Sequence, residues 1–358
     1  ELLPKESIST TFLHEDTEDE FVWPVDPTHY RLEGLVGHGS SALVYKGICV
    51  DNNQVVAVKV VKLDVQYSNL TSLQNEVITM RLCHHPNIIR CYSCFISGTS
   101  LWIVCPYMCK GSFLRILQYL KSTSFIREGE GFEESVVAYI ISETAKGLQY
   151  LHSSGLIHRD IKAGNILVDA DGHICIGDLG MVVKEGHRNS TLNRLHISGT
   201  PCYMAPEAIT HKHCHCQSDI WSLGITAMEL YKGTPPLARF DNEEILQYTV
   251  HEEAPSLNSY SDAFPRDPSS SFDAWIHGVL RKDMKERYPI GRVLTHRWLL
   301  QAEEGREALV RLLQSIPDLP VLESVEELNP WTEDPNACMQ DISWDFSLPP
   351  VKAISTSD

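Results

Sequence analysis

A chain of 358 residues is longer than one compact core usually supports, so its length predicts either one large two-lobed domain with extensions or two domains. Hydrophobic residues make up 43% of the chain, and no apolar run approaches the ~18 residues of a membrane span, so membrane insertion is not expected. The 11 cysteines are scattered among apolar residues, which excludes a dense disulfide scaffold and predicts reduced thiols in the cytoplasm or the nucleus.

The net charge of −17 argues against a nucleic-acid partner, but the acidity is concentrated at the ends of the chain. Residues 1–29 contain 8 acidic and 1 basic residue, and residues 301–358 contain 12 acidic and 3 basic residues. The part between them is nearly neutral, with 27 acidic and 26 basic residues. This distribution predicts two solvated acidic extensions that flank one domain.

Residues 30–108 have the pattern of a small antiparallel sheet with one helix. Apolar and polar residues alternate around a glycine turn over 30–50, and a third strand is centred on Lys59. Apolar residues from Leu70 to Met80 then recur at helical spacing, with Glu76 beside them. Two further strands are expected before residue 108, on either side of a turn at Gly98.

Residues 109–300 are predominantly helical by pattern, because apolar residues recur at helical spacing and several segments end at a glycine. The predicted helices lie within 132–155, 218–233, 272–283 and 290–305. Proline and acidic residues accumulate from residue 315 onward, which indicates an irregular chain.

The chain is therefore predicted to have three parts and an α+β fold. An acidic N-terminal extension, 1–29, precedes the body, and an acidic, largely irregular tail, 301–358, follows it. The body, 30–300, divides into a small antiparallel β-sheet lobe with one helix, 30–108, and a larger, mostly helical lobe, 109–300.

The segment GHGSSALV, residues 37–44, leaves one predicted strand and enters another. A dinucleotide-binding turn enters a helix instead, so this context excludes a Rossmann enzyme. Gly37 and Gly39 have no Cβ and would let backbone N–H groups approach a phosphate closely. Ala42 occupies the third glycine position of a GxGxxG pattern, so the segment alone is a weak indication of phosphate binding.

Lys59 places a charge in an otherwise apolar strand, and Glu76 lies among apolar residues of the next predicted helix. An unpaired buried ammonium is costly, so the two side chains are expected to neutralise each other. The pair alone leaves two roles open, namely a structural ion pair and a ligand-binding group.

Residues 156–180, LIHRDIKAGNILVDADGHICIGDLG, combine acids and an amide with an apolar hairpin. The hairpin can bring Asp160 and Asp178 together, and carboxylates this close repel each other unless a metal ion or a proton intervenes. Asn165 and Asp178 offer hard oxygen ligands that suit Mg²⁺ shared with phosphates. Asp160 would then be left to accept a proton from a hydroxyl, whereas Asp169 is expected to shape the turn.

Six motifs in chain order resemble a protein kinase catalytic domain. They are the glycine-rich segment, VAVK ending at Lys59, the helical Glu76, HRDIKAGN at 158–165, DLG at 178–180, and APE at 205–207. The resemblance covers the whole predicted body and implies the two-lobed kinase fold.

The same motifs are similar to those of the sterile-20 family of Ser/Thr kinases. Lys162 and the Gly199–Thr200 pair are typical of the Ser/Thr class, and CHHPNII, GTPCYMAPE and SDIWSLGITAMEL resemble that family. The sequence is most like the oxidative-stress-responsive, proline- and alanine-rich branch, whose glycine loop also accepts alanine at the position of Ala42. The resemblance implies an enzyme that transfers the γ-phosphoryl group of ATP, with Mg²⁺, to protein Ser/Thr hydroxyls in a signalling cascade.

The resemblance also implies roles for individual residues. Asp160 would orient and deprotonate the substrate hydroxyl, Lys162 would stabilise the transferring phosphoryl group, and Asn165 and Asp178 would bind Mg²⁺. The implied nucleotide-binding residues are Val36, Gly37, His38, Gly39, Ser40, Ser41, Ala42, Val44, Ala57, Lys59, Glu76, Cys105, Pro106, Met108, Leu167 and Asp178.

Within that set, Cys105 falls at the position known as the gatekeeper. The Pro106 carbonyl and the Met108 N–H would meet the adenine. Arg287 matches a structural position and is expected to pair with Glu207.

The sequence departs from the family pattern at several positions. Leu179 replaces the Phe of DFG, which keeps an apolar side chain and should preserve metal binding. Arg159 is typical of kinases switched by phosphorylation of the activation segment, which implies an upstream kinase. His196 occupies the usual regulatory Thr position, so the hydroxyl that is used stays open among Ser190, Thr191 and Ser198.

Residues 211–216, HKHCHC, are rich in metal-ligand types. Their spacing matches no zinc-site pattern, so a structural role is expected and metal binding is the alternative.

In the acidic tail, Trp344, Asp345 and Phe346 resemble the Trp–Glu–Phe ending with which sterile-20-type pseudokinases bind a helical-repeat scaffold, mouse protein 25. The alternative is an incidental aromatic pair. The motif keeps a second function open, that of a pseudokinase-like allosteric regulator that binds nucleotide and a scaffold. Pseudokinases generally lose the catalytic base or the metal-binding Asp, whereas Asp160 and Asp178 are both present here, which favours catalysis.

Overall fold

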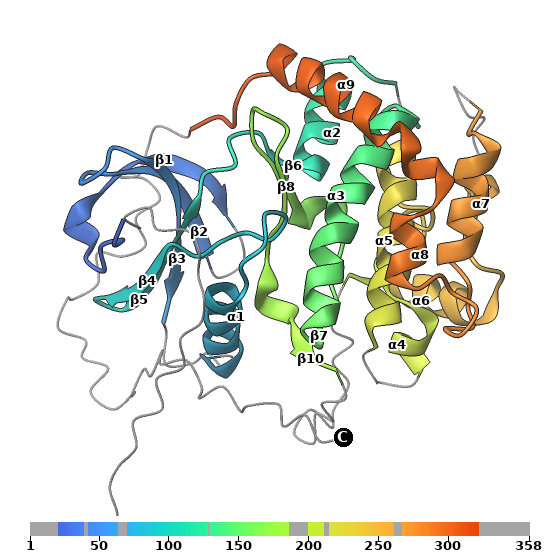
Figure 1. The fold of residues 1–358 in the computed structure, drawn as a ribbon, viewed down its shortest axis with the longest axis horizontal. Helices are drawn as coiled ribbons and strands as arrows, with labels where there is room; N and C mark the ends of the chain where they lie inside the picture. The colour runs from blue at the N-terminus through green and yellow to red at the C-terminus, as the bar shows by residue number, and fades with distance from the viewer. Residues whose placement is uncertain are drawn as a thin grey trace, which may run out of the picture.

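The computed structural model describes residues 21–38, 42–63, 70–127, 129–185, 200–210, 215–260 and 267–321. These residues form two lobes, a β-sheet lobe with one helix and a larger helical lobe (Figure 1). The predicted α+β class and the order of the lobes are confirmed. None of the helices in these ranges is long and apolar enough to cross a membrane.

The first lobe is a five-stranded antiparallel sheet with the strand order β1-β2-β3-β5-β4. In β3 every second side chain, Val56, Val58 and Val60, is buried in one apolar cluster. Successive side chains of a strand point to opposite faces, so Lys59 points to the other face, which meets α1. The bounds are β1 Tyr30–His38, β2 Ala42–Cys49, β3 Val55–Lys62, α1 Leu70–Leu82, β4 Ser93–Ser97 and β5 Ser100–Pro106.

The second lobe is built around α5, in which all residues from Ser218 to Lys232 are buried. A helix that is apolar on all sides is stable only where protein surrounds it, which explains the SDIWSLGITAMEL run. Gly233 ends it with φ +78°, as predicted, but the helix begins at Cys216, with His215 as its N-cap, two residues before the predicted start at 218. The helices are α2 Phe113–Ser122, α3 Glu134–Ser153, α4 Pro206–Thr210, α5 Cys216–Lys232, α6 Asn242–His251, α7 Ser270–Val279, α8 Ile290–Leu294 and α9 Ala302–Ser315.

Short strands at the boundary between the lobes position the polar residues of the 156–180 segment. β6 (Gly111–Ser112), β8 (Ile166–Val168) and β9 (Ile174–Ile176) form one sheet, and β7 (Leu156–Ile157) pairs with β10 (Val183–Lys184). Asp169 closes the β8–β9 turn by accepting the N–H groups of Asp171 (3.0 Å) and His173 (2.9 Å). Its predicted role as a turn residue is confirmed.

A buried ion pair joins α4 to the segment that precedes α8. The Arg287 guanidinium donates to both carboxylate oxygens of Glu207, at 2.6 Å and 3.0 Å. Both side chains are almost fully buried, and the pairing agrees with the sequence prediction.

The predicted tail, 301–358, is helical over residues 302–315, which form α9 and pack against α3 (Figure 1), whereas the sequence pattern predicted a helix only as far as Gly305. Gly305, Leu309 and Leu313 make a buried stripe at helical spacing. Acidic residues on the exposed side of α9 give the segment a tail-like composition that hides this stripe. At Gly305 the two helices approach so closely that a Cβ would lie 1.8 Å from the backbone oxygen of Ser135.

We predict that Gly305→Ala destabilises the protein by about 1–3 kcal/mol or more, because the added methyl group forces α9 away from α3. Gly291→Ala is the matched control, since a Cβ at Gly291 in α8 would meet nothing within 4 Å. That change is expected to be neutral or to stabilise by up to about 1 kcal/mol through helix propensity. Urea unfolding measures both variants, and equal stabilities would show that α9 does not pack as described.

Candidate active site

Lys59 and Glu76 form a close ion pair that joins β3 to α1. Their charged atoms lie 2.6 Å apart, and the Glu76 side chain is buried. Burial lowers the pKa of the Lys59 ammonium, but Glu76 and Asp178 outweigh it and hold that pKa above its ordinary value. Lys59 is therefore a permanent cation that is stabilised by the negative charge of Asp178 as well as by its contact with Glu76. This second carboxylate favours a ligand-binding role over a purely structural pair.

Asp160 lies between β7 and β8, and three neighbouring residues hold its side chain. One carboxylate oxygen accepts hydrogen bonds from the Lys162 ammonium (2.6 Å) and the Asn165 amide (2.9 Å). The other accepts the Thr200 hydroxyl (3.0 Å). Burial raises the pKa of Asp160, but these partners outweigh it and hold the pKa below its usual value. The carboxylate is therefore ionised and fixed in one orientation.

The backbone beside Asp160 is strained and is held in place by hydrogen bonds to a residue of α5. Arg159 has φ +71°, a left-handed conformation that is unfavourable for residues other than glycine. The fully buried carboxylate of Asp219 accepts the N–H groups of His158 (2.9 Å) and Arg159 (2.8 Å). The imidazole of His152, 2.8 Å away, also bonds to it.

Asp178 and Asn165 supply oxygen atoms at the mouth of this site. Asp178 is exposed, has φ +52° and lies two residues after the end of β9. The Asn165 side-chain nitrogen donates to Asp160, which leaves the amide oxygen as a free acceptor. Gly180 lies between two carboxylates, because a Cβ there would be 3.2 Å from Glu76 Oε2 and 3.3 Å from Asp178 Oδ1. The residue set fits a hard divalent cation, which prefers oxygen ligands.

Leu179, which replaces the Phe of the DFG motif, is buried to 1% exposure in a short 3₁₀ turn, Leu179–Met181, that packs against α1. The apolar side chain therefore belongs to the buried hydrophobic core. That the replacement preserves metal binding stays a prediction.

Neighbouring strands bring several of the predicted nucleotide-binding residues together. Gly37 pairs with Val44, and Val44 pairs in turn with Lys59 across three adjacent strands. Ala57 lies opposite Cys105 on β5. The other described residues of the set are Val36 on β1, Ala42 on β2, Pro106 at the end of β5, Met108 after it and Leu167 on β8.

Several predicted residues lie outside the described ranges. They are Gly39, Ser40, Ser41, Ser190, Thr191, Ser198, Trp344, Asp345 and Phe346, and the side chain of His38 joins them.

Two residues of the site were missed as functional residues by sequence reasoning. The Thr200 hydroxyl accepts from Lys162 (2.7 Å) while it donates to Asp160, so it links the predicted base to its cation. The Gly199–Thr200 pair could have indicated this role, but above it indicates only the Ser/Thr class of kinases. Arg115 on α2 donates to the Val36 carbonyl (3.0 Å) and so connects the two lobes beside the glycine-rich segment. No motif marks this contact.

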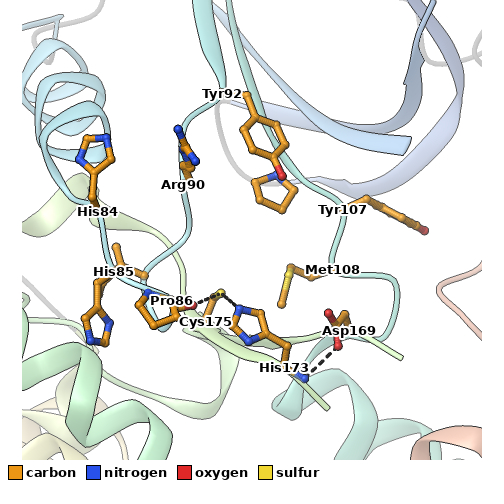
Figure 2. Close-up of a pocket in the computed structure, with 12 residues that line it drawn as sticks. His84, His85, Pro86, Arg90, Tyr92, Tyr107, Met108, Asp169, His173 and Cys175 are labelled. Carbon is orange, nitrogen blue, oxygen red and sulfur yellow. Dashed lines mark hydrogen bonds between the residues drawn. The ribbon is translucent and has the colours of Figure 1, made fainter. Parts of the chain in front are cut away.

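A pocket of about 490 Å³ lies beside the connection between the lobes (Figure 2). Met108 points into it from one side, and His173 and Asp169 border it from the β8–β9 hairpin. Lys59 and Asp160 are absent from its lining, so this pocket is separate from the polar site.

The sequence of this chain is similar to those of known protein kinases. The family model described as the protein kinase domain matches residues 30–299. The chain is 34% identical to serine/threonine-protein kinase fray2 of Dictyostelium discoideum over 298 residues, which is 83% of this chain and 28% of that protein.

Two further relatives are similar. Germinal center kinase 3 of Caenorhabditis elegans is 32% identical over 84% of this chain and 52% of its own length. Serine/threonine-protein kinase dst1 of D. discoideum is 34% identical over 78% of this chain and 36% of its own length. The matched region thus spans about half or less of each of these relatives. They are Ste20-family kinases, which confirms the resemblance, and the chain belongs to the protein kinase family.

Proposed function

We propose that this chain is a Ser/Thr protein kinase that transfers the γ-phosphoryl group of ATP to protein Ser or Thr hydroxyls in a signalling cascade. The observation that carries the proposal is the ionised Asp160 held by Lys162, Asn165 and Thr200. The similarity to proteins named serine/threonine-protein kinases supports the same activity.

In this mechanism the Asp160 carboxylate accepts the proton of the substrate hydroxyl while the hydroxyl oxygen forms a bond to the γ-phosphorus of ATP. The bond between that phosphorus and the bridging oxygen breaks, and ADP leaves. The Lys162 ammonium, next to Asp160, balances the negative charge on the transferring group. Lys59, held by Glu76, is placed to bind the α- and β-phosphates.

The protein kinase domain implies ATP and a divalent metal ion, and we propose that the ion is Mg²⁺. Asn165 and Asp178 would hold it, because they offer carboxamide and carboxylate oxygens, which suit Mg²⁺ shared with substrate phosphates. When bound, the ion would neutralise phosphate charge.

The alternative function, a non-catalytic regulator that binds nucleotide and a scaffold, has less support. Asp160 retains all three side-chain contacts, and Lys59 retains its carboxylate partner. A regulator that only bound nucleotide would not need the Asp160 contacts.

We predict that Asp160→Asn lowers kcat about 10²–10⁴-fold, because the amide cannot accept the hydroxyl proton. The measurement is phosphate transfer from Mg-ATP to a generic Ser/Thr protein substrate, and mass spectrometry of the same reaction shows whether this chain itself phosphorylates Ser190, Thr191 or Ser198 or whether an upstream kinase is needed. Asp273→Asn, at a half-buried residue on α7 whose side chain is 46% exposed, is the control and should keep full activity. Equal rates for Asp160→Asn and the wild type would rule out the proposed base.

We predict that Thr200→Val lowers kcat about 10- to 100-fold, because it removes two charge-assisted hydrogen bonds, to Asp160 and from Lys162. Thr200→Ser keeps the hydroxyl and should stay within a few-fold of the wild type. Steady-state kinetics with Mg-ATP compares them, and a fully active Thr200→Val would remove Thr200 from the mechanism.

We also propose that Trp344, Asp345 and Phe346 dock a helical-repeat scaffold similar to mouse protein 25. The support is the sequence motif alone. Deletion of residues 340–358 should weaken binding to that scaffold at least tenfold in isothermal titration calorimetry, and the double change of Trp344 and Phe346 to Ala should do the same. Trp331→Ala, another tail aromatic, is the control. Unchanged affinity of the double variant would refute the motif.

A location in the cytoplasm, and also in the nucleus, stays a prediction. Its support is that the nine cysteines in the described residues are free thiols, as a reducing compartment requires. Fractionation of cells that express the chain tests it, and recovery from an oxidising compartment would contradict it.

A further inference from the structure

Three side chains of metal-ligating type meet where the activation segment approaches α5. Glu185 directly follows β10, His215 is the N-cap of α5, and Cys216 is its first residue. One ligand atom from each lies within 4.8 Å of the other two. Glu185 comes from a segment 30 residues earlier in the chain, which is why the spacing within HKHCHC gave no indication of this group.

The backbone of each residue is fixed by an element of the fold. The Glu185 N–H donates to the Gly155 carbonyl (2.8 Å), which extends the pairing of β10 with β7. The other two residues begin α5, the buried central helix, and the His215 ring accepts the Gln217 N–H (3.2 Å). The Cys216 N–H also faces the Glu185 carboxylate, at 3.4 Å. The three side chains therefore start from anchored positions.

Two distances within the group, each to a different nitrogen of the His215 ring, are close to the spacing between ligands around a tetrahedral zinc ion. Zinc bonds of about 2.1 Å to nitrogen and oxygen and about 2.3 Å to sulfur put the ligand atoms roughly 3.4–3.6 Å apart. The Glu185 oxygen lies 3.4 Å from Nε2 of His215, and the Cys216 sulfur lies 3.5 Å from Nδ1 of the same ring. A metal ion would use one ring nitrogen, and small side-chain rotations suffice to reach it.

The donor set also selects the kind of ion. Sulfur and imidazole nitrogen favour zinc over magnesium or calcium, which prefer oxygen. The pair formed by Asn165 and Asp178 has only oxygen donors. Glu185 and His215 are exposed, so a water molecule can complete the coordination of three protein ligands.

We propose that Glu185, His215 and Cys216 bind one Zn²⁺ ion that ties the end of β10 to the start of α5. On binding, the Cys216 thiol releases its proton to solvent, the sulfur–zinc bond forms, and hydration water leaves the ion. The ion uses either Nδ1 itself or Nε2 with the ring proton moved to Nδ1, and in both cases Nδ1 no longer accepts the Gln217 N–H, so that N-cap hydrogen bond is given up. The ion is separate from the catalytic metal and needs no nucleotide.

Cobalt is the probe, because Co²⁺ occupies zinc sites and a thiolate ligand gives it a charge-transfer absorption band that oxygen ligands cannot produce. The reduced, metal-free full chain is titrated with Co²⁺ and then with Zn²⁺. We expect a thiolate band that saturates at one ion per chain and disappears when Zn²⁺ is added. The absence of this band would overturn the proposal.

Substitutions identify the ligands. Cys216→Ser should abolish the band, and Glu185→Gln should weaken Co²⁺ binding at least tenfold. His215→Asn is informative because Asn is also a good N-cap, so α5 keeps its cap while the imidazole is lost, and binding should again weaken at least tenfold. Cys202→Ser is the matched control in a half-buried thiol outside the group and should change nothing.

Cys214→Ser separates this site from the rest of the HKHCHC segment. A band that survives Cys216→Ser, or one that is lost only in Cys214→Ser, would overturn the assignment. Circular dichroism of the metal-free variants verifies folding, and Glu185→Gln provides the decisive comparison if Cys216→Ser does not fold. The Co²⁺ absorption band does not depend on phosphate transfer. A negative result for the zinc site can therefore be distinguished from a negative result for the kinase activity, which the Asp160→Asn variant tests.

Discussion

The buried carboxylate of Asp219 is the interaction on which the polar site depends. Its two oxygens accept consecutive N–H groups from His158 and Arg159, and the second of these residues has a strained left-handed backbone. Such a conformation costs of order 1–3 kcal/mol and persists only where surrounding structure determines it. Because Asp219 belongs to α5, the most buried helix described, the rigid core of the large lobe fixes the direction of Asp160.

The charged groups Lys59, in the sheet lobe, and Asp160, in the helical lobe, are held in the same way. Each functional group is buried enough to be held in place and has enough partners to stay ionised. The pKa of Lys59 is held above its ordinary value by Glu76 and Asp178 against burial, and that of Asp160 is held below its ordinary value by Lys162, Thr200 and Asn165. Both groups therefore keep their charge at neutral pH. Folding in each lobe supplies this electrostatic environment before any ligand binds.

Most of the fold was predictable where a pattern is local. The β-branched density of β3 and the apolar run of α5 each indicate their element, and the order of motifs predicted the residues of the polar site. The α9 helix was missed because its buried stripe is narrow and its exposed face is acidic. Thr200 was missed as a site residue because its value comes from two hydrogen bonds across 38 and 40 residues of sequence. Contacts of this kind depend on tertiary structure, which a single sequence does not show without a known family.

The hydrogen bond from Arg115 to the Val36 carbonyl has a kinetic consequence. Val36 belongs to the sheet and Arg115 to the helical lobe, so a rotation that separates the lobes at this point has to break this bond. A hydrogen bond from a charged donor contributes about 1.5–3 kcal/mol, which is enough to slow such an opening by one to two orders of magnitude. The Arg115 guanidinium thereby restrains the strand that leads into the glycine-rich segment. The residence time of a ligand bound between the lobes then depends on Arg115, which does not itself take part in the chemistry.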